Sequence, residues 1–185
     1  NLADLPGVHV ADLHRDLSSK RVLTQEFVSG VKISNVEAID AAGLDRALIG
    51  ENALRAAIKM LLIDGFFHAD PHPGNLIVNL DTGVVTFLDC GMVGELSVAQ
   101  RVNMILLLWT VVQGDMGGMG QQLRALSEPF RPVDDAVFIR AFKRRMARYG
   151  EGSGADFRDI LNAGMEVLRD NGLLLGLAVG LGGTA

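Results

Sequence analysis

Residues 66–75 read FFHADPHPGN, and this stretch decides how the rest of the chain is interpreted. Its two prolines, separated by one residue, exclude a regular helix or a central strand, so the stretch is predicted to form a loop. Two short β-like runs follow, residues 76–79 and 84–88, with Asp-Thr-Gly between them as a typical hairpin turn. Because a hairpin returns the chain close to its starting point, Asn75 and Asp89 are expected to lie near each other.

Helical patterns lie on both sides of this loop and hairpin. Before it, apolar residues at helical spacing predict one long helix from about residue 44 to residue 63, ended by Gly65. Further helices are predicted near residues 97–113, 121–127, 134–149 and 155–171, with glycine-rich breaks at 114–120 and 150–154 and a stop at Gly172. The remaining predictions are an irregular segment at 1–20, a β-like run at 22–28, and a core segment or docking helix at 173–181. The fold class is therefore α+β with a helix-dominated body.

The composition narrows the class of protein. The 185 residues include 49% apolar residues, enough for a real core. A formal net charge of −5 argues against a nucleic-acid partner, and a single cysteine gives no internal disulfide. The apolar runs at 104–112 and 173–183 fall short of the ~18 residues that a membrane span needs, and no signal peptide is recognisable. The chain begins with Asn1 and ends in an apolar run, so we expect a fragment of a longer protein.

Three polar residues around the loop and hairpin point to chemistry. Asn75 and Asp89 offer an amide oxygen and a carboxylate, which are hard ligands that suit Mg²⁺. Asp70, on the preceding loop, then faces a substrate hydroxyl or a water. This order of Asp, Asn and Asp is the layout of phosphoryl transfer in kinase-like folds. The simpler alternative is that all three residues only favour turns.

Two longer stretches carry a resemblance to a known family. Residues 67–75 (FHADPHPGN) and 88–94 (LDCGMVG) resemble the UbiB-like family of atypical kinases, also called the coenzyme Q kinase or aarF-domain family. Residues 22–32 (VLTQEFVSGVK) resemble that family's hinge between its two lobes. The resemblance implies a protein-kinase-like fold, mostly the helical C-lobe with an active-site hairpin. It places the end of the N-lobe and the hinge at 1–30 and the C-lobe at 31–185, with the chain truncated at both ends.

The resemblance also implies roles for individual residues. Asp70 corresponds to the catalytic-loop aspartate and His68 to the histidine that supports this loop, while Asn75 and Asp89 correspond to the metal ligands. The set taken as catalytic comprises Asp70, His68 and His72, with His72 near phosphate or metal-bound water.

For the nucleotide, the backbone of Glu26 and Val28 would pair with the adenine edge. Ile77 would line the floor of the adenine site, and Gln25 would gate the back of the pocket. Cys90 stands where the family often has Phe, and we expect it to be a small buried residue.

The functional expectation is an ATP- and Mg²⁺-binding phosphotransferase or ATPase that supports isoprenoid-quinone (ubiquinone) biosynthesis. The phosphate loop and lysine of the family's N-lobe are not among these residues, so the fragment alone is expected to be inactive. Only about seven residues separate Asp89 from the next helix, which favours a small-molecule substrate, or ATP hydrolysis coupled to another task, over a peptide substrate. The resemblance implies a lipid or quinone precursor as the candidate substrate. The resemblance adds quinone-biosynthesis proteins and a membrane surface as candidate partners. The expected location is cytoplasmic, with peripheral membrane association as an option.

Several alternatives stay open. One is a regulatory, pseudokinase-like scaffold that binds nucleotide without transferring phosphate, and another is a small-molecule kinase of the aminoglycoside or choline type. A third treats His68, Asp70 and His72 as ligands of a transition metal. The basic cluster at 143–148 is either a solvated helix face or a contact for acidic lipid headgroups.

Overall fold

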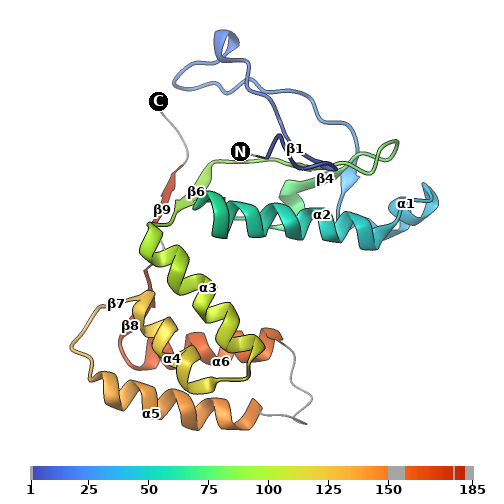
Figure 1. The fold of residues 1–185 in the computed structure, drawn as a ribbon. Coiled ribbons are helices and arrows are strands. Elements are labelled where there is room, and N and C mark those ends of the chain that lie inside the picture. Colours follow the sequence, from blue (N-terminus) through green and yellow to red (C-terminus); the bar gives the residue numbers. More distant parts are fainter. Residues whose placement is uncertain (1, 150–156, 177, 182–185) are drawn as a thin grey trace. The chain divides into compact units, whose positions relative to one another are not determined.

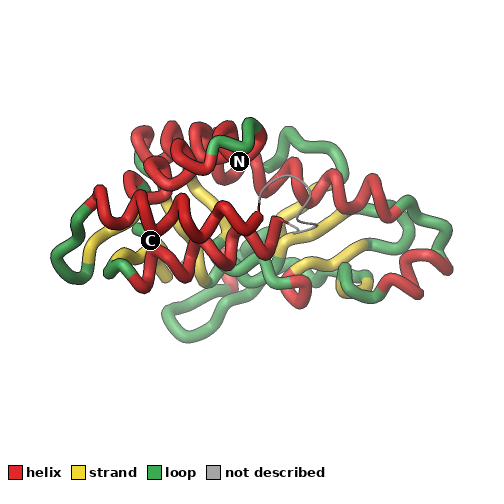
Figure 2. The backbone as a smooth tube through the Cα atoms, turned by 90° about the horizontal axis from the view of Figure 1, so that it is seen from below, coloured by secondary structure: helices red, strands yellow, loops and turns green. Residues whose placement is uncertain are grey.

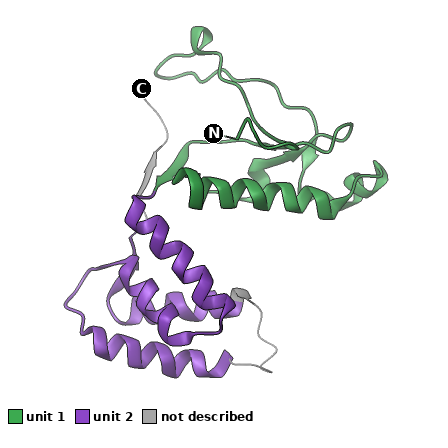
Figure 3. Cartoon of the chain, viewed as in Figure 1, with its two compact units in different colours: residues 1–95, 179–185 green, residues 96–178 purple. Residues whose placement is uncertain are grey.

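The computed structural model describes residues 2–149, 157–176 and 178–181. By its internal contacts the chain divides into two compact units, coloured separately in Figure 3. Unit 1 comprises residues 1–95 and 179–185, and unit 2 comprises residues 96–178. Figure 2 distinguishes the helices, strands and loops of both units, and the mixture confirms the predicted α+β class.

A four-stranded sheet forms the centre of unit 1, in the order β1-β5-β4-β2. Its strands are β1 (Val8–Val10), β2 (Val31–Lys32), β4 (Leu76–Val78) and β5 (Val85–Phe87). The predicted hairpin is β4–β5, an antiparallel pair in which Leu76 lies opposite Phe87. The β1 strand joins this hairpin in parallel, with His9 opposite Thr86. Because β5 leads directly to Asp89, the sheet carries both ends of the predicted metal site.

Helices cover this sheet (Figure 1). The short helix α1 (Val36–Ala41) precedes α2 (Arg46–Ile58), which Asp45 caps through its side chain. The predicted long helix then continues as a π-helical segment, η2 (Lys59–Asp64), and ends at Gly65 with φ of 69°. The core between helices and sheet consists of Leu2, Ile39, Ile49, Ala56, Leu76, Val78, Val85 and Phe87. A π-helical turn is uncommon and is often found beside functional sites, and this one leads into the predicted loop within two residues.

A second sheet, in the order β3-β6-β9, brackets the loop. Its strands are β3 (Phe66–His68), β6 (Met92–Glu95) and β9 (Ala178–Leu181). The first two pair antiparallel, with Phe67 opposite Gly94. No Cβ would fit at Gly94, because it would lie 2.2 Å from Cζ of Phe67. The loop that begins after β3 is thus held between the two sheets of unit 1.

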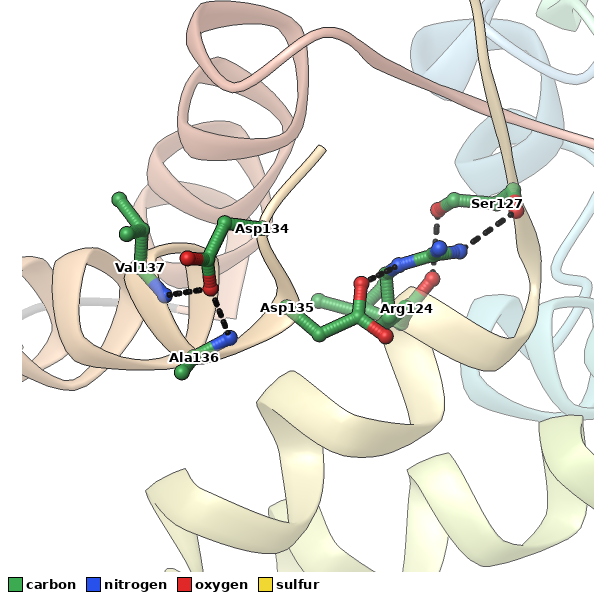
Figure 4. A network of polar contacts seen from close by, with 7 residues as sticks. Arg124, Ser127, Asp134, Asp135, Ala136 and Val137 are labelled. Atoms are coloured by element: carbon green, nitrogen blue, oxygen red, sulfur yellow. Dashed lines mark hydrogen bonds and ion pairs between the residues drawn. The ribbon is translucent and has the colours of Figure 1, made fainter. Parts of the chain in front are cut away.

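Unit 2 is helical, with one small β-pair. Its elements are α3 (Val98–Val112), α4 (Met116–Ala125), β7 (Ser127–Pro129), α5 (Asp135–Met146), η4 (Ala147–Tyr149), α6 (Phe157–Asp170) and β8 (Leu173–Leu175). The capping box predicted at Ser97 is present. A core that includes Phe138, Phe142 and Met146 joins α4, α5 and α6. Figure 4 shows how Arg124 on α4 reaches the Asp135 carboxylate at 2.6 Å and the backbone oxygen of Ser127, which ties α4 to the start of α5.

The structure corrects five predictions. Within the stretch expected to be a loop, Phe66–His68 form β3 and Pro73–Asn75 form the short 3-10 helix η3. Residues 22–28 form only isolated bridges, because no strand of the described structure pairs with them along their length, and the described strand β2 begins at Val31. The segment expected to be irregular contains β1 and the short 3-10 helix η1 (Arg15–Leu17). The break at 114–120 is mostly helix, because Asp115 caps α4 within it. In place of a docking helix, the described residues of the segment 173–181 form the strands β8 and β9, and Leu173 belongs to the core as expected. The predicted break at 150–154 lies outside the described residues.

The described helices contain no stretch that is both long enough and apolar enough to cross a membrane.

Candidate functional site

His68 is the buried centre of the candidate site. Its imidazole is only 7% exposed and lies near the ring of Phe87, with the ring centroids 6.3 Å apart. Nδ1 accepts a hydrogen bond from the backbone N–H of Asp70 at 3.0 Å, so the proton of the ring is on Nε2. Nε2 donates that proton to the backbone oxygen of Leu88 at 2.9 Å. One side chain therefore ties the start of the loop to the residue that precedes Asp89.

Asn75 closes the same loop from its other end. Its side-chain Nδ2 donates to the backbone oxygen of Asp70 at 3.1 Å, and its backbone oxygen accepts from the N–H of Leu88 at 2.8 Å. The short 3-10 helix η3 (Pro73–Asn75) delivers it to this position. Asp70 itself is exposed, and no hydrogen bond or ion pair of the described residues engages its carboxylate. The loop backbone is thus fixed while the Asp70 carboxylate faces outward.

Asp89 adopts a backbone conformation that side chains rarely adopt. Its φ is 53°, in the left-handed region, and it is the one non-glycine residue with positive φ among those described. Such a conformation costs about 1–2 kcal/mol for most residues, although Asp and Asn tolerate it better than others. The strain is maintained by the neighbouring bonds at Leu88 and by the return of the chain into β6. Backbone strain of this kind is concentrated at functional sites.

The donor set of Asn75 and Asp89 fits a divalent cation such as Mg²⁺. Because Nδ2 of Asn75 is used by the Asp70 carbonyl, Oδ1 is the side-chain atom left to bind a ligand. Within the described part of the chain, neither this oxygen nor the Asp89 carboxylate has a hydrogen-bond partner. Both are hard oxygen ligands on adjacent backbone segments, and phosphate oxygens and water would complete the coordination.

The transition-metal alternative does not fit the geometry. Both ring nitrogens of His68 are used in hydrogen bonds, and Nδ1 of His72 accepts the backbone N–H of Gly74 at 3.0 Å. Among the described residues, no group of three or more His, Cys, Asp or Glu side chains is placed to hold a metal ion. His72 is exposed and caps η3 with its ring, and its assignment to the catalytic set stays a prediction. His68, in contrast, is placed to position the loop rather than to contact a substrate.

The segment that resembles a hinge is held at Glu26. A carboxylate oxygen of Glu26 lies 2.7 Å from Nε2 of His9 and accepts the backbone N–H of Asp12 at 3.1 Å. These interactions, with that of His9 the largest, lower the pKa of Glu26 below its ordinary value. The N–H of Glu26 donates to the backbone oxygen of Asp12. Among the described residues, the Glu26 carbonyl and the Val28 N–H have no such partner, so both are open to a ligand.

Ile77 lies beside the end of this segment. It is half-buried on β4, and a Cβ built on Gly30 would be 2.9 Å from its Cγ2 and 2.3 Å from the backbone oxygen of Val78. The hinge segment therefore reaches the sheet next to the residue predicted to line the adenine floor. Gln25 is exposed and forms an isolated bridge with Leu13, and its role as a gate stays a prediction.

Cys90 corrects one expectation and illustrates the electrostatics of the site. It is exposed rather than buried. Partial loss of hydration raises the pKa of its thiol, and the neighbouring Asp89 carboxylate raises it further.

Sequence reasoning missed His9 and Gly30. No local pattern marks His9, because its partner Glu26 is 17 residues away. Gly30 is part of the Ser-Gly turn signal, but its close approach to β4 is visible only once the sheet is formed.

Comparison with known proteins places these residues in a family. The model of the ABC1 atypical kinase-like domain matches residues 1–123. The chloroplastic protein ACTIVITY OF BC1 COMPLEX KINASE 7 of Arabidopsis thaliana is 38% identical over 133 residues, covering 72% of this chain and 19% of that protein. The probable protein kinase UbiB of Photobacterium profundum is 37% identical over 100 residues, covering 52% of this chain and 18% of that protein.

The chain spans about a fifth of the length of the curated relatives that it matches. Among solved structures, the complex of Rv3197 with erythromycin from Mycobacterium tuberculosis is 16% identical and has a TM-score of 0.46. That match covers 89% of this chain and 49% of the solved one. A likeness at this level supports no functional argument.

Proposed function

Because the chain belongs to the ABC1 atypical kinase-like family, we propose that unit 1 forms the ATP- and Mg²⁺-binding part of an atypical kinase or ATPase. The resemblance to UbiB-like proteins is confirmed by this match and by the UbiB relative. The kinase-like, mixed α and β fold is confirmed with it. In the proposed site Asp70 positions the attacking group, Asn75 and Asp89 hold the cation, and the Glu26–Val28 backbone meets adenine.

The observation that supports this proposal is the set of hydrogen bonds by which His68 and Asn75 join the backbone of Asp70 to that of Leu88, the residue before Asp89. His68 bonds the N–H of Asp70 and the oxygen of Leu88, and Asn75 bonds the backbone of the same two residues. A group of turn residues would need no such connection. Phosphoryl transfer does need it, because catalysis there consists mainly of positioning and charge neutralisation.

The region after Asp89 supports a small substrate or ATP hydrolysis. β6 begins at Met92 and pairs at once with β3, so the chain after the cation site is used in a sheet. Little of this segment is left on which a peptide substrate can dock. We therefore propose that the intact protein acts on a small molecule, such as an isoprenoid-quinone precursor, or couples ATP hydrolysis to quinone biosynthesis.

The test is calorimetric titration of ATP and ADP into the full-length protein that contains these residues. Titrations are run with Mg²⁺, with EDTA, and with the variant Asp89→Asn, which tolerates the left-handed backbone and removes only the charge. The proposal expects Mg²⁺-dependent binding that Asp89→Asn abolishes. Binding that ignores both Mg²⁺ and the substitution would support a regulatory scaffold, and no nucleotide binding at all would refute the proposal.

A further inference from the structure

The contact between His9 and Glu26 links a strand of the central sheet of unit 1 to a largely solvent-exposed segment. His9 is the middle residue of β1, whereas Glu26 belongs to the hinge segment, defined here as residues 12–29. Nε2 of the imidazole lies 2.7 Å from Oε2 of the carboxylate. The side chains are 37% and 39% exposed, so the contact is a partly solvated, charge-assisted one.

His9 is held by a well-anchored strand. β1 pairs in parallel with β5, and His9 lies opposite Thr86, which is only 3% exposed. Gly7 directly precedes β1, and a Cβ added at Gly7 would lie 2.2 Å from the side chain of Asn52 on α2. The backbone that carries His9 is therefore enclosed by the strand that leads to Asp89 and by a helix.

The hinge segment has few attachments of its own. Many of its apolar side chains face solvent, including Phe27, which is 91% exposed. Its internal bonds connect residues of the same segment, such as His14 with Thr24 and Asp12 with Glu26. Directly after the segment, β2 pairs with β4 and holds its C-terminal end. Within residues 12–29, the contact between His9 and Glu26 is the one hydrogen bond or ion pair of the described residues that joins the segment to the rest of unit 1.

We propose that His9 is a positioning residue that fixes the hinge segment against the sheet that carries the cation site, and so sets the affinity for the adenine part of the nucleotide. This inference rests on the proposed function, because it takes the Glu26–Val28 backbone as the adenine contact. His9 itself touches no nucleotide. It holds the Glu26 carboxylate, which also accepts the Asp12 N–H, and the backbone of Glu26 is thereby held at a set distance from β4 and β5.

The expected change in ATP affinity follows from the fraction of molecules in which the hinge segment is ordered. If the ordered hinge is the form that binds adenine, the apparent Kd rises by the factor by which the ordered fraction falls. Loss of one partly exposed, charge-assisted hydrogen bond corresponds to a change of about three- to tenfold. The affinity for inorganic tripolyphosphate with Mg²⁺, which requires the cation site but no adenine contact, stays within about twofold of the wild-type value.

The experiment compares ATP and tripolyphosphate binding in the full-length protein, by calorimetry with Mg²⁺. The variants are His9→Ala, His9→Gln and the control His14→Ala. His14 is a histidine of the hinge segment whose ring makes no hydrogen bond in the described structure, and its effect on Glu26 is the smallest of those that lower the pKa of that carboxylate. His9→Ala is expected to weaken ATP binding about three- to tenfold without changing tripolyphosphate binding. His9→Gln keeps a hydrogen-bond donor for Glu26 and is expected to restore most of the affinity. His14→Ala is expected to behave as wild type.

Amide hydrogen exchange of the ligand-free protein supplies a second reading that does not depend on nucleotide. His9→Ala should speed exchange at Glu26 and neighbouring hinge amides, whereas His14→Ala should not. Equal weakening of ATP binding and tripolyphosphate binding, or unchanged amide exchange of the hinge segment in His9→Ala, would overturn the inference while leaving the proposed function intact. A wild-type protein that binds neither ligand would refute the proposed function, and the adenine role of His9 with it.

Discussion

Gly94 lies under the ring of Phe67, and substituting it tests how tightly the candidate site is packed. A Cβ at this position would lie 2.2 Å from Cζ of Phe67 and 2.6 and 2.7 Å from the two Cε atoms. Carbon atoms pack favourably at about 3.5–4.0 Å, so Gly94→Ala requires the ring to move by more than about 1 Å. Phe67 adjoins His68, and the displaced ring therefore strains the strand that leads into the loop.

The expected cost is that of overpacking, about 1–3 kcal/mol. Native-state hydrogen exchange at the β3 and β6 amides of the full-length protein measures it locally, without assuming that the whole protein unfolds in one step. Because about 1.36 kcal/mol corresponds to a factor of ten, these amides should exchange about 5- to 150-fold faster in Gly94→Ala.

Gly50 provides the matched control, because substituting alanine there should stabilise the protein locally, whereas Gly94→Ala should destabilise it. It is exposed within α2, and nothing lies within 4 Å of an added Cβ. Gly50→Ala should therefore stabilise α2 by about 0.5–1 kcal/mol through the higher helix propensity of alanine, and amide exchange in α2 should slow accordingly.

The double variant with Phe67→Leu identifies the cause. If the ring is what resists the new methyl group, Gly94→Ala should cost at least about 1 kcal/mol less in the Phe67→Leu background. An equal cost in both backgrounds, or no cost in either, would refute the packing argument.

Three further predictions concern the backbone and the hinge. Asp89→Ala should be about 1 kcal/mol less stable than Asp89→Asn, because Ala does not tolerate the left-handed φ. Both variants should abolish Mg²⁺-dependent nucleotide binding. Equal thermal midpoints of the two variants would contradict the expected difference in stability. The folded-state pKa of Glu26 lies below its ordinary value of 4.5, so its contribution is present above that value and is lost as the pH falls through the lowered pKa. The protection factors of the hinge amides, which correct for the slower intrinsic exchange at lower pH, should thus fall on acidification in wild type and change less in Glu26→Gln, and identical pH profiles of these protection factors would contradict the role of His9 as its partner. Gly30→Ala places a Cβ 2.3 Å from the Val78 oxygen and should weaken ATP binding more than tripolyphosphate binding. Equal losses of affinity for the two ligands would contradict the hinge assignment.

The predictable part of the site is the part whose partners are close in sequence. The prolines around His72 exclude a regular α-helix or central strand, the Asp-Thr-Gly turn fixes the hairpin, and the two together bring Asn75 toward Asp89. The structure confirms the hairpin, with Asn75 and Leu88 joined by a backbone hydrogen bond, and confirms the loop for residues 69–72, between β3 and η3. The roles of Asp70, Asn75 and Asp89 as catalytic residue and ligands stay predictions.

The unpredicted part depends on contacts between distant residues. β1 has the sequence of any short apolar strand, and it becomes one only because the β5 edge at Val85 is there to pair with it. Residues 22–28 have strong β-like character, but in the described structure their β-pairing is limited to isolated bridges with Leu13 and Ser19. A strand needs a neighbour along its length, and a single-sequence pattern does not show whether that neighbour is present.

The same reasoning explains why His9 matters and why no motif reveals it. In the proposed site the hinge must be ordered to contact a nucleotide, yet several apolar side chains of residues 12–29 face solvent, Phe27 among them. The proposed positioning role of His9 on β1 would supply part of that order through a polar contact. His68 belongs to a motif that can be read in the sequence, whereas the contact of His9 with Glu26 matches no motif and is found only from the folded chain.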